Sequence, residues 1–520
     1  MNVFLLYKDH DFKISQNFSW NEQEIIQDLE LNTLFNAMAA GDKFLLEVAK
    51  SAVMSGLNND IDTILYRQEI LKDCMNNPSL IRDIYNIAAE SIERERKNYW
   101  GILNKYPSWI LHRSLDVMQM FIKMLYTLRV IAEKNLNKFF SRGFKEFFNM
   151  LITELGDDYF KEIQDHVEQL KFRDGILVST RLGNGNKASE YTLHKLQAKK
   201  KGWLMELIED YIHRQNQEGR LLWLSGFFAE EPGSYTFYIS SRDDGGIRAL
   251  SGMKDEGIND VANTLAQSND HILAFFRLLK TELGFYISAL NLHKQLTLLD
   301  EPLSFPDPVD NNRSVHSFKG LYDACLALTM KKKIVANDIN ADNKNLVIIT
   351  GANQGGKSTF LRSIGLSQIM MQCGLFVPAV SFCSNTCDSL FTHFKREEDT
   401  TMTSGKLDEE LNRMNKIINI NSANPMFLFN ESFSATNERE GSEIAKQIVS
   451  ALLEKKVKIY YVTHLYEFAN SFYSGRTDHF LFLRAERNTD GTRTYKLIEG
   501  EPLQTSYGED LYNKVFGNVQ

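Results

Sequence analysis

The chain has 520 residues, of which 43% are hydrophobic and 11% aromatic. This length is too great for one core and the apolar content can fill several, so two to four domains are expected and global disorder is excluded. Lys and Arg number 59 against 67 Asp and Glu, and the net charge of −8 argues against a dedicated nucleic-acid coat protein, although a local basic patch could still bind a phosphate backbone.

The cysteines and the N-terminal residues indicate the compartment. Cys383 and Cys387 have no second Cys or His pair nearby to complete a zinc site, so we expect reduced thiols. The apolar run at residues 3–7 ends at Lys8, too early for a signal-peptide core, and no run is long enough to span a membrane. The prediction is a cytoplasmic protein, free or on DNA, without a membrane partner.

The first 170 residues have a helical pattern. From residue 21 onward, apolar side chains recur at three- and four-residue spacing, which predicts successive amphipathic helices. Residues 115–131 and 139–155 add many aromatic side chains, which indicate helix–helix packing rather than a cofactor site.

The pattern changes near residue 174. Residues 175–178 and 235–239 are β-rich, and turn signals follow at 183–186 and 244–246. Helical spacing resumes at residues 257–298. Residues 301–312 carry three prolines and two asparagines and are predicted to be a linker.

Beyond this linker, strand and helix patterns alternate. The expected strands are residues 345–350, 425–429, 457–462, 480–484 and 494–498, with helices at 407–420 and 442–453. This alternation predicts a doubly wound α/β sheet.

The segment GANQGGKS, residues 351–358, fits G-x-x-x-x-G-K-[ST] at every fixed position and stands between an expected strand and an expected helix. In such a loop backbone N–H groups surround phosphates, the lysine reaches the β- and γ-phosphates, and the hydroxyl holds Mg²⁺ near a positive helix end. The sequence therefore predicts a nucleotide and Mg²⁺ site. Its candidate residues are Gly351, Asn353, Gly355, Gly356, Lys357, Ser358 and Thr359.

Further motifs resemble the MutS family of DNA mismatch-repair ATPases, within the ABC-type ATPases. In chain order they are VAND at 335–338, TGANQGGKST at 350–359, GLFVPA at 374–379, Ser404-Gly405, Asn430-Glu431 with Thr436, Glu440 and Gly441, Thr463-His464, and SYG at 506–508. LYRQEIL at 65–71 looks like the opening of the MutS helical core.

The resemblance implies ATP as the nucleotide and assigns roles to matching residues. Asn337 would lie against the adenine, beside Ile334, which stands where the family often has an aromatic residue. Glu431 would polarise the attacking water, and His464 would contact the γ-phosphate. Together with Lys357, these two are the expected catalytic residues.

The resemblance also implies a homodimer joined through the ATPase domains. Ser404, just before the helix expected from Leu407, would reach the ATP of the opposing subunit through that helix's positive end. The working unit would then hold two ATP sites, each completed by the other copy.

The chain departs from the MutS pattern in two respects. The mismatch-reading and connector domains have no counterpart, so no residue is assigned to mispair recognition. MutS has Asp where this chain has Asn430, which with Ser358 is the predicted Mg²⁺ contact; a neutral amide is a weaker partner for that hard cation than a carboxylate. We therefore expect slow hydrolysis.

We expect residues 1–300 to form a mainly α-helical core and lever domain with a small β-containing, clamp-like insert near 174–250. Residues 301–520 would form an α/β ABC-type P-loop ATPase domain. The predicted function is an ATP-switched, mismatch-repair-related clamp on nucleic acid, with DNA favoured. The best basic runs are residues 199–201, within the insert, and 331–333. Alternatives are an ATPase acting on structured RNA or ribosomes, and a scaffold that holds ATP with little hydrolysis.

Overall fold

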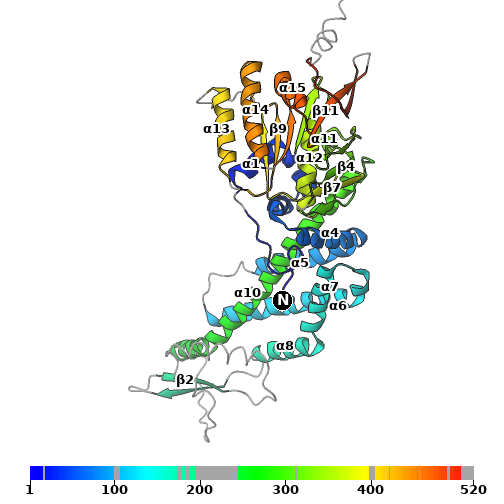
Figure 1. The fold of residues 1–520 in the computed structure, drawn as a ribbon. Coiled ribbons are helices and arrows are strands. Elements are labelled where there is room, and N and C mark those ends of the chain that lie inside the picture. Colours follow the sequence, from blue (N-terminus) through cyan, green and yellow to red (C-terminus); the bar gives the residue numbers. More distant parts are fainter. Residues whose placement is uncertain are drawn as a thin grey trace, which may run out of the picture. The chain divides into compact units, whose positions relative to one another are not determined.

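The computed structural model forms two compact units (Figure 1). Unit 1 comprises residues 1–3, 79–140 and 144–280, and unit 2 comprises residues 4–78, 141–143 and 281–520. Residues described by the structure are 1–15, 18–98, 106–171, 177–182, 188–194, 244–310, 313–396, 405–420, 422–455, 457–488 and 492–504. The domain boundary expected at residue 301 stays a prediction.

Unit 1 is mainly helical. It contains most of α5 (Pro78–Asn98), α6 (Pro107–Asn135), most of α7 (Arg142–Glu154), α8 (Asp157–Leu170) and the first part of α10 (Asp244–Thr297). Aromatic side chains form its core, as the helical spacing predicted: the ring centroids of Phe121 and Phe276 are 5.6 Å apart.

The insert contributes an antiparallel pair of strands, β1 (Leu177–Leu182) and β2 (Ala188–His194). The turn signal at 183–186 and the expected strand at 235–239 lie outside the described residues. The turn expected at 244–246 is wrong, because α10 begins at Asp244. Asp and Gly favour both turns and helix starts, so the local sequence could not decide between them.

Unit 2 combines the N-terminal helices with an α/β domain. Its helices are α1 (Trp20–Asp28), α2 (Leu31–Ala39), α3 (Lys43–Ser55), α4 (Ile61–Asn76), the end of α10, α11 (Ala324–Met330), α12 (Lys357–Gln372), α13 (Lys406–Ile418), α14 (Glu438–Glu454) and α15 (Tyr466–Ser474). The predicted order, a helical N-terminal region followed by an α/β domain, is confirmed.

The main sheet has six strands in the order β12-β11-β6-β10-β9-β8. These are β6 (Leu346–Gly351), β8 (Ser389–Phe394), β9 (Pro425–Asn430), β10 (Lys458–Val462), β11 (Phe480–Arg487) and β12 (Arg493–Glu499). All of these strands except β12 run parallel to one another, and β12 pairs antiparallel with β11. The carboxyl ends of β6, β9 and β10 therefore meet at one edge, where ligands bind in such sheets.

Helices cover both faces of this sheet (Figure 1). Phe427 and Phe429 of β9 share a buried cluster with side chains of α13, α14 and α15. Leu428, between them, points to the opposite face and lies against Gly365 of α12. Side chains alternate between the two faces along a strand, and because helices cover both faces, every residue of β6 is buried.

A second sheet has the order β3-β7-β4-β5. Its strands are β3 (Asp307–Val309), β4 (His316–Leu321), β5 (Asn337–Asn340) and β7 (Ser381–Asn385). The segment predicted to be a linker is therefore packed: Ser304 pairs with Val377, and β3 pairs with β7. Pro308 is tolerated because β3 is an edge strand.

The N-terminal residues of unit 2 are attached to α10 by a buried carboxylate. Glu282, fully buried, accepts hydrogen bonds from the backbone N–H groups of Leu5 (2.5 Å), Leu6 (3.1 Å) and Phe12 (3.2 Å). Burial raises the pKa of Glu282 to about 7, against the opposing effect of these bonds. Within the described part of the chain, the helices include none long and apolar enough to cross a membrane.

Candidate nucleotide site

The phosphate loop joins β6 to α12 through two glycines with left-handed backbones. Gly351 has φ 109° and Gly356 has φ 88°, conformations that L side chains rarely adopt. A Cβ on Gly351 would lie 2.8 Å from the backbone nitrogen of Ala485 on the neighbouring strand β11. The loop therefore needs glycine both for its curvature and for its approach to β11.

Lys357 is the first residue of α12, and its side chain folds back over the loop. Its Nζ donates hydrogen bonds to the carbonyl oxygens of Gly351 and Ala352, both at 3.0 Å. The residue is 5% exposed, and burial lowers its pKa, whereas the nearby Glu431 raises it. Among the described residues Lys357 has no ion-pair partner, so a buried ammonium stands at the loop where a phosphate would fit.

Ser358 and Asn430 are the two predicted Mg²⁺ contacts, and the structure brings them together. The Ser358 hydroxyl, on α12, donates to Asn430 Oδ1, at the end of β9, over 2.9 Å. Both offer oxygen atoms, the ligand type that Mg²⁺ prefers, but neither is charged. The pair fits a Mg²⁺ held mainly by phosphate and water oxygens.

Glu431 and His464 follow two neighbouring parallel strands. Glu431 directly follows β9 and has φ 55°, and its N–H donates to Val462 O at the end of β10 over 2.8 Å. His464 Nδ1 lies 3.8 Å from Glu431 Oε1. This histidine lowers the pKa of Glu431, against the effect of burial, so the carboxylate is ionised at neutral pH.

Asn337 holds strands β5 and β12 together. Its Oδ1 accepts from Leu497 N over 2.7 Å, and its Nδ2 donates to Tyr495 O over 3.3 Å. The residue is 4% exposed. The side chain is thus occupied in joining two strands, and its predicted place against the adenine stays a prediction.

The remaining loop residues differ in exposure. Gly355 is buried, Thr359 is partly buried, and Asn353 is exposed. The sequence did not single out Arg493 of β12, whose Nε donates to Asn353 O over 3.3 Å and whose charge lowers the pKa of Lys357. Its alternating strand pattern carried no signal for this contact.

Ser404 lies outside the described residues, as do the SYG motif and residues 199–201. The helix expected after Ser404 is present as α13, with Gly405 as its N-cap and no side-chain hydrogen bond at the cap. Of the two basic runs noted in the sequence, the one at residues 331–333 lies within the described residues, and all three of its side chains are exposed.

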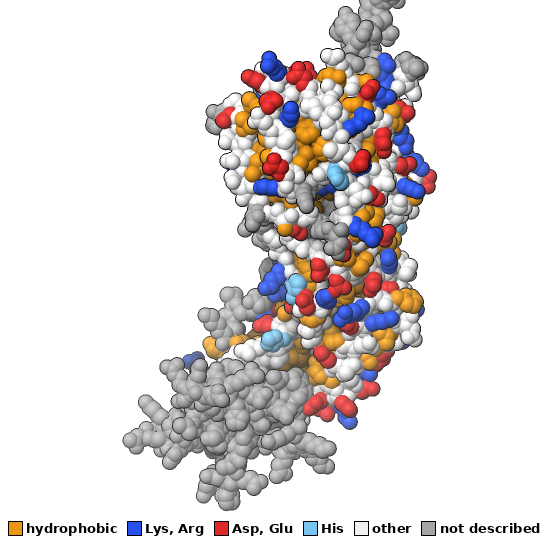
Figure 2. Space-filling view, viewed as in Figure 1, with side chains coloured by type: hydrophobic (Ala, Val, Ile, Leu, Met, Phe, Trp, Pro, Cys, Tyr) orange, Lys and Arg blue, Asp and Glu red, His pale blue; other side chains and the backbone are white. Residues whose placement is uncertain are grey.

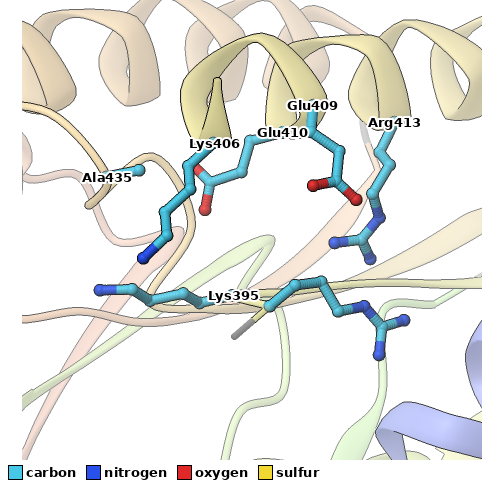
Figure 3. A pocket seen from close by; sticks show the side chains of 7 residues that line it. Lys395, Lys406, Glu409, Glu410, Arg413 and Ala435 are labelled. Carbon is cyan, nitrogen blue, oxygen red and sulfur yellow. The ribbon is translucent and has the colours of Figure 1, made fainter. Parts of the chain in front are cut away.

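A small pocket lies beneath the start of α13. Its lining residues are Lys395, Arg396, Lys406, Glu409, Glu410, Arg413 and Ala435. The ammonium ends of Lys395, just after β8, and Lys406, the first residue of α13, point to the same side of it (Figure 3). Arg413, which also lines the pocket, donates to Phe394 O at 2.9 Å and to Glu24 at 2.6 Å.

Two protein families match the chain in succession. The model of the MutS2 N-terminal domain matches residues 59–299, and that of MutS domain V matches residues 347–515. The second match contains the phosphate loop, Asn430, Glu431 and His464.

Individual relatives point to the same family. A DNA mismatch repair protein MutS from Caldanaerobacter subterraneus subsp. tengcongensis is 24% identical over 419 residues, which are 74% of this chain and 47% of that protein. Another, from Leuconostoc mesenteroides, is 31% identical over 188 residues, 34% of this chain and 22% of that protein. The MutS protein homolog 4 of Homo sapiens is 28% identical over 188 residues, 35% and 20% of the two chains.

The chain therefore spans less than half the length of these relatives. With a helical MutS2-type region and a domain V whose phosphate loop is intact, the chain belongs to the MutS family.

Proposed function

We propose that unit 2 binds ATP with Mg²⁺ and hydrolyses it slowly. One arrangement carries this proposal: a buried lysine with no ion-pair partner among the described residues, the Ser358–Asn430 oxygen pair and the ionised Glu431 all lie around one phosphate loop. Phosphoryl transfer to water needs mainly positioning and charge stabilisation, and these groups are of the types that supply both.

Each residue has a distinct task. Lys357 exchanges its carbonyl partners for β- and γ-phosphate oxygens, and the N-terminus of α12 adds its positive end. Ser358 and Asn430 orient Mg²⁺, which when bound neutralises phosphate charge. Glu431 orients the attacking water through its carboxylate, and His464 holds that carboxylate and contacts the γ-phosphate.

Asn430 favours a second candidate, an ATP-holding protein with little turnover. Replacing a carboxylate by an amide removes charge from the Mg²⁺ shell, which weakens the stabilisation of the transition state. The two candidates differ in one measurable quantity, the rate of phosphate release.

We further propose that two copies pair through their ATPase domains, with Ser404 and the N-terminus of α13 completing the partner's site. Family membership supports this arrangement, and so does the N-terminus of α13, whose N-cap is Gly405 and beside which Lys395 and Lys406 line one pocket. ATP bound between the copies would stabilise the dimer by mass action, whereas ADP would not.

The proposed target is nucleic acid, with DNA favoured over RNA. The support is the family and two of the relatives, each of which is named DNA mismatch repair protein MutS. On the face drawn in Figure 2, acidic and basic side chains are interspersed over the part of unit 2 that carries α13 and α14. A local basic surface, rather than the net charge, would therefore contact the backbone.

Binding to homoduplex, mismatched and branched DNA and to structured RNA, with and without ATP at 50 and about 200 mM salt, tests the target. The proposal is supported if the chain prefers one DNA structure and ATP changes its affinity for that structure. In the Lys357→Ala variant, ATP should no longer change this affinity. Preference for RNA supports the alternative, and the absence of any ATP-dependent binding contradicts both.

Mixing two inactive chains tests the shared site. In a heterodimer of Ser404→Arg with Lys357→Ala, one site carries both defects and the other is intact, so about half of the per-dimer activity should return. Heterodimers that remain as inactive as either parent contradict a site completed by the partner.

A further inference from the structure

The turn after β9 has an unusual backbone. Glu431 has φ 55° and Phe433 has φ 61°, so two residues with large side chains adopt the left-handed conformation within three positions. Such conformations persist when the surroundings hold them, and they cluster at functional sites. The side chain of Phe433 is fully buried.

His393, near the end of β8, contacts this turn directly. Its Nδ1 lies 2.8 Å from Ser432 Oγ, and its Nε2 lies 3.0 Å from the carbonyl oxygen of Glu410 on α13. The ring also stacks on Phe433, with centroids 5.1 Å apart and planes at 24°. One buried side chain thus joins the turn that carries Glu431 to helix α13.

The hydrogen-bond directions follow from the partners. A carbonyl oxygen can only accept, so Nε2 of His393 carries the proton that it donates to Glu410 O. Burial, aided by Arg413, lowers the pKa of His393 to about 4, which keeps the ring neutral at pH 7. Nδ1 then carries no proton, and the Ser432 hydroxyl, which donates its single proton to His393 O over 2.5 Å, shares that proton with Nδ1 at 2.8 Å.

Other contacts hold the same turn. Burial raises the pKa of the Glu410 carboxyl, again on α13, and the backbone N–H of Phe433 opposes this effect. Tyr461 of β10 donates its hydroxyl proton to Ser432 O over 2.9 Å. Gly441 of α14 leaves room for the turn, because a Cβ there would lie 2.3 Å from Phe433 O.

We propose that His393 is a positioning residue for ATP hydrolysis, which fixes the Glu431 turn to α13 through Ser432 and Glu410. This inference rests on the proposed ATPase function. Since α13 begins at the point where a partner's nucleotide would bind, His393 makes the orientation of Glu431 depend on the placement of that helix. A histidine that served only core packing would affect stability without this effect on turnover.

The test uses His393→Phe, which keeps a stacked ring beside Phe433 and removes both ring hydrogen bonds. Single-turnover phosphate release should fall about 10- to 100-fold, because misplacing a reacting group by about an ångström has effects of that size. The dissociation constant for ATP should stay within about twofold. His393→Gln, whose amide offers N–H donors and a carbonyl acceptor, should recover part of the loss.

The control is Phe391→Leu on the same strand. Phe391 is buried against Phe427, and its ring cannot form the hydrogen bonds that join the turn to α13, so this variant lowers stability while turnover stays within about twofold. A double variant of His393→Phe with Ser432→Ala should lose less turnover than the product of the two single losses, because both substitutions remove the contact between the ring and the hydroxyl. Equal losses in His393→Phe and the control, or a parallel loss of ATP affinity, overturn the proposal.

Hydrogen exchange separates failure of this proposal from failure of the ATPase function. The ATPase function fails if the parent chain hydrolyses no ATP, or if its hydrolysis does not depend on Lys357. Hydrogen exchange still tests whether His393 holds the turn. His393→Phe should speed exchange at residues 431–436 at least about tenfold and leave the β9 amides protected. Unchanged exchange at the turn, or an equal rise across β8, β9 and α14, contradicts the role.

Discussion

The hydroxyl of Ser358 donates a 2.9 Å hydrogen bond to Asn430 Oδ1, which joins the end of the phosphate loop to the end of β9. The two residues are 72 positions apart in the sequence. They meet because β6 and β9 both pair in parallel with β10, so their carboxyl ends share one edge of the sheet. Asn430 is therefore a direct neighbour of the loop serine, and the effect of its missing charge can be measured.

Asn430→Asp should raise the rate of ATP hydrolysis about tenfold, which corresponds to about 1.4 kcal/mol of transition-state stabilisation. The carboxylate would accept a stronger bond from Ser358 and add a negative charge to the Mg²⁺ shell. Steady-state phosphate release at saturating Mg²⁺ measures the effect, with Asn430→Ala as the comparison. Equal rates in the parent and the Asp variant would show that Mg²⁺ positioning is not limiting.

Lys357→Ala should weaken ATP binding roughly 10- to 100-fold, the range for charged hydrogen bonds to phosphate. Circular dichroism should be unchanged, because the ammonium contacts loop carbonyls and not the helical core. Lys344→Ala is the control: that lysine also bonds a backbone carbonyl, at Asp478, but precedes β6 instead of following it. Undiminished ATP affinity in Lys357→Ala would show that the loop does not form the ATP site.

Gly355→Ala should weaken ATP binding by about tenfold or more with little change in melting temperature. The added Cβ would lie 2.6 Å from the Ala485 Cβ and 2.8 Å from Ala352 O, so the loop must shift. Gly252→Ala on α10 is the matched control, because a Cβ there meets no atom within 4 Å. Normal nucleotide titrations of the Gly355 variant would mean that the loop adapts without cost.

Glu282 predicts a pH dependence of the stability of unit 2. Its pKa rises from an ordinary 4.5 to about 7 in the folded state, so the folded protein favours the protonated carboxyl. The contribution of Glu282 is complete below pH 4.5 and is lost as the pH rises through about 7.

Urea titrations of the parent and Glu282→Gln at pH 5 and 8 measure this effect. Between these pH values the parent should lose about 2–3 kcal/mol relative to the variant. A difference in unfolding free energy that is independent of pH would show that Glu282 ionises normally in the folded protein.

The phosphate loop was predictable because its information is local. A buried strand, closely spaced glycines and a helix start lie within a short segment, and each requires particular residue types. The hydrogen bonds of Asn337 were not predictable, because its partners Tyr495 and Leu497 lie 158 and 160 positions away. The burial of His393 between β8, α13 and the Glu431 turn depends on tertiary packing in the same way.

Local signals misled where one residue type suits two structures. Asp244 and the following glycines have the composition of a turn, yet they begin α10. Prolines at residues 302–308 suggested a free linker, yet an edge strand accepts Pro308 because the sheet does not require a backbone N–H at that position. In both cases the long-range contacts of the segment decided its structure.

Glu431→Gln tests the central claim most directly, because it removes the carboxylate charge beside His464 and keeps the shape of the side chain. ATP and Mg²⁺ binding is measured by equilibrium titration and hydrolysis by single-turnover phosphate release on the same preparation. The predicted result is an ATP dissociation constant within about threefold of the parent and a hydrolysis rate about 10²- to 10⁴-fold lower. Hydrolysis at the parent rate would contradict the assignment of Glu431 and, with it, the proposed mechanism of this site.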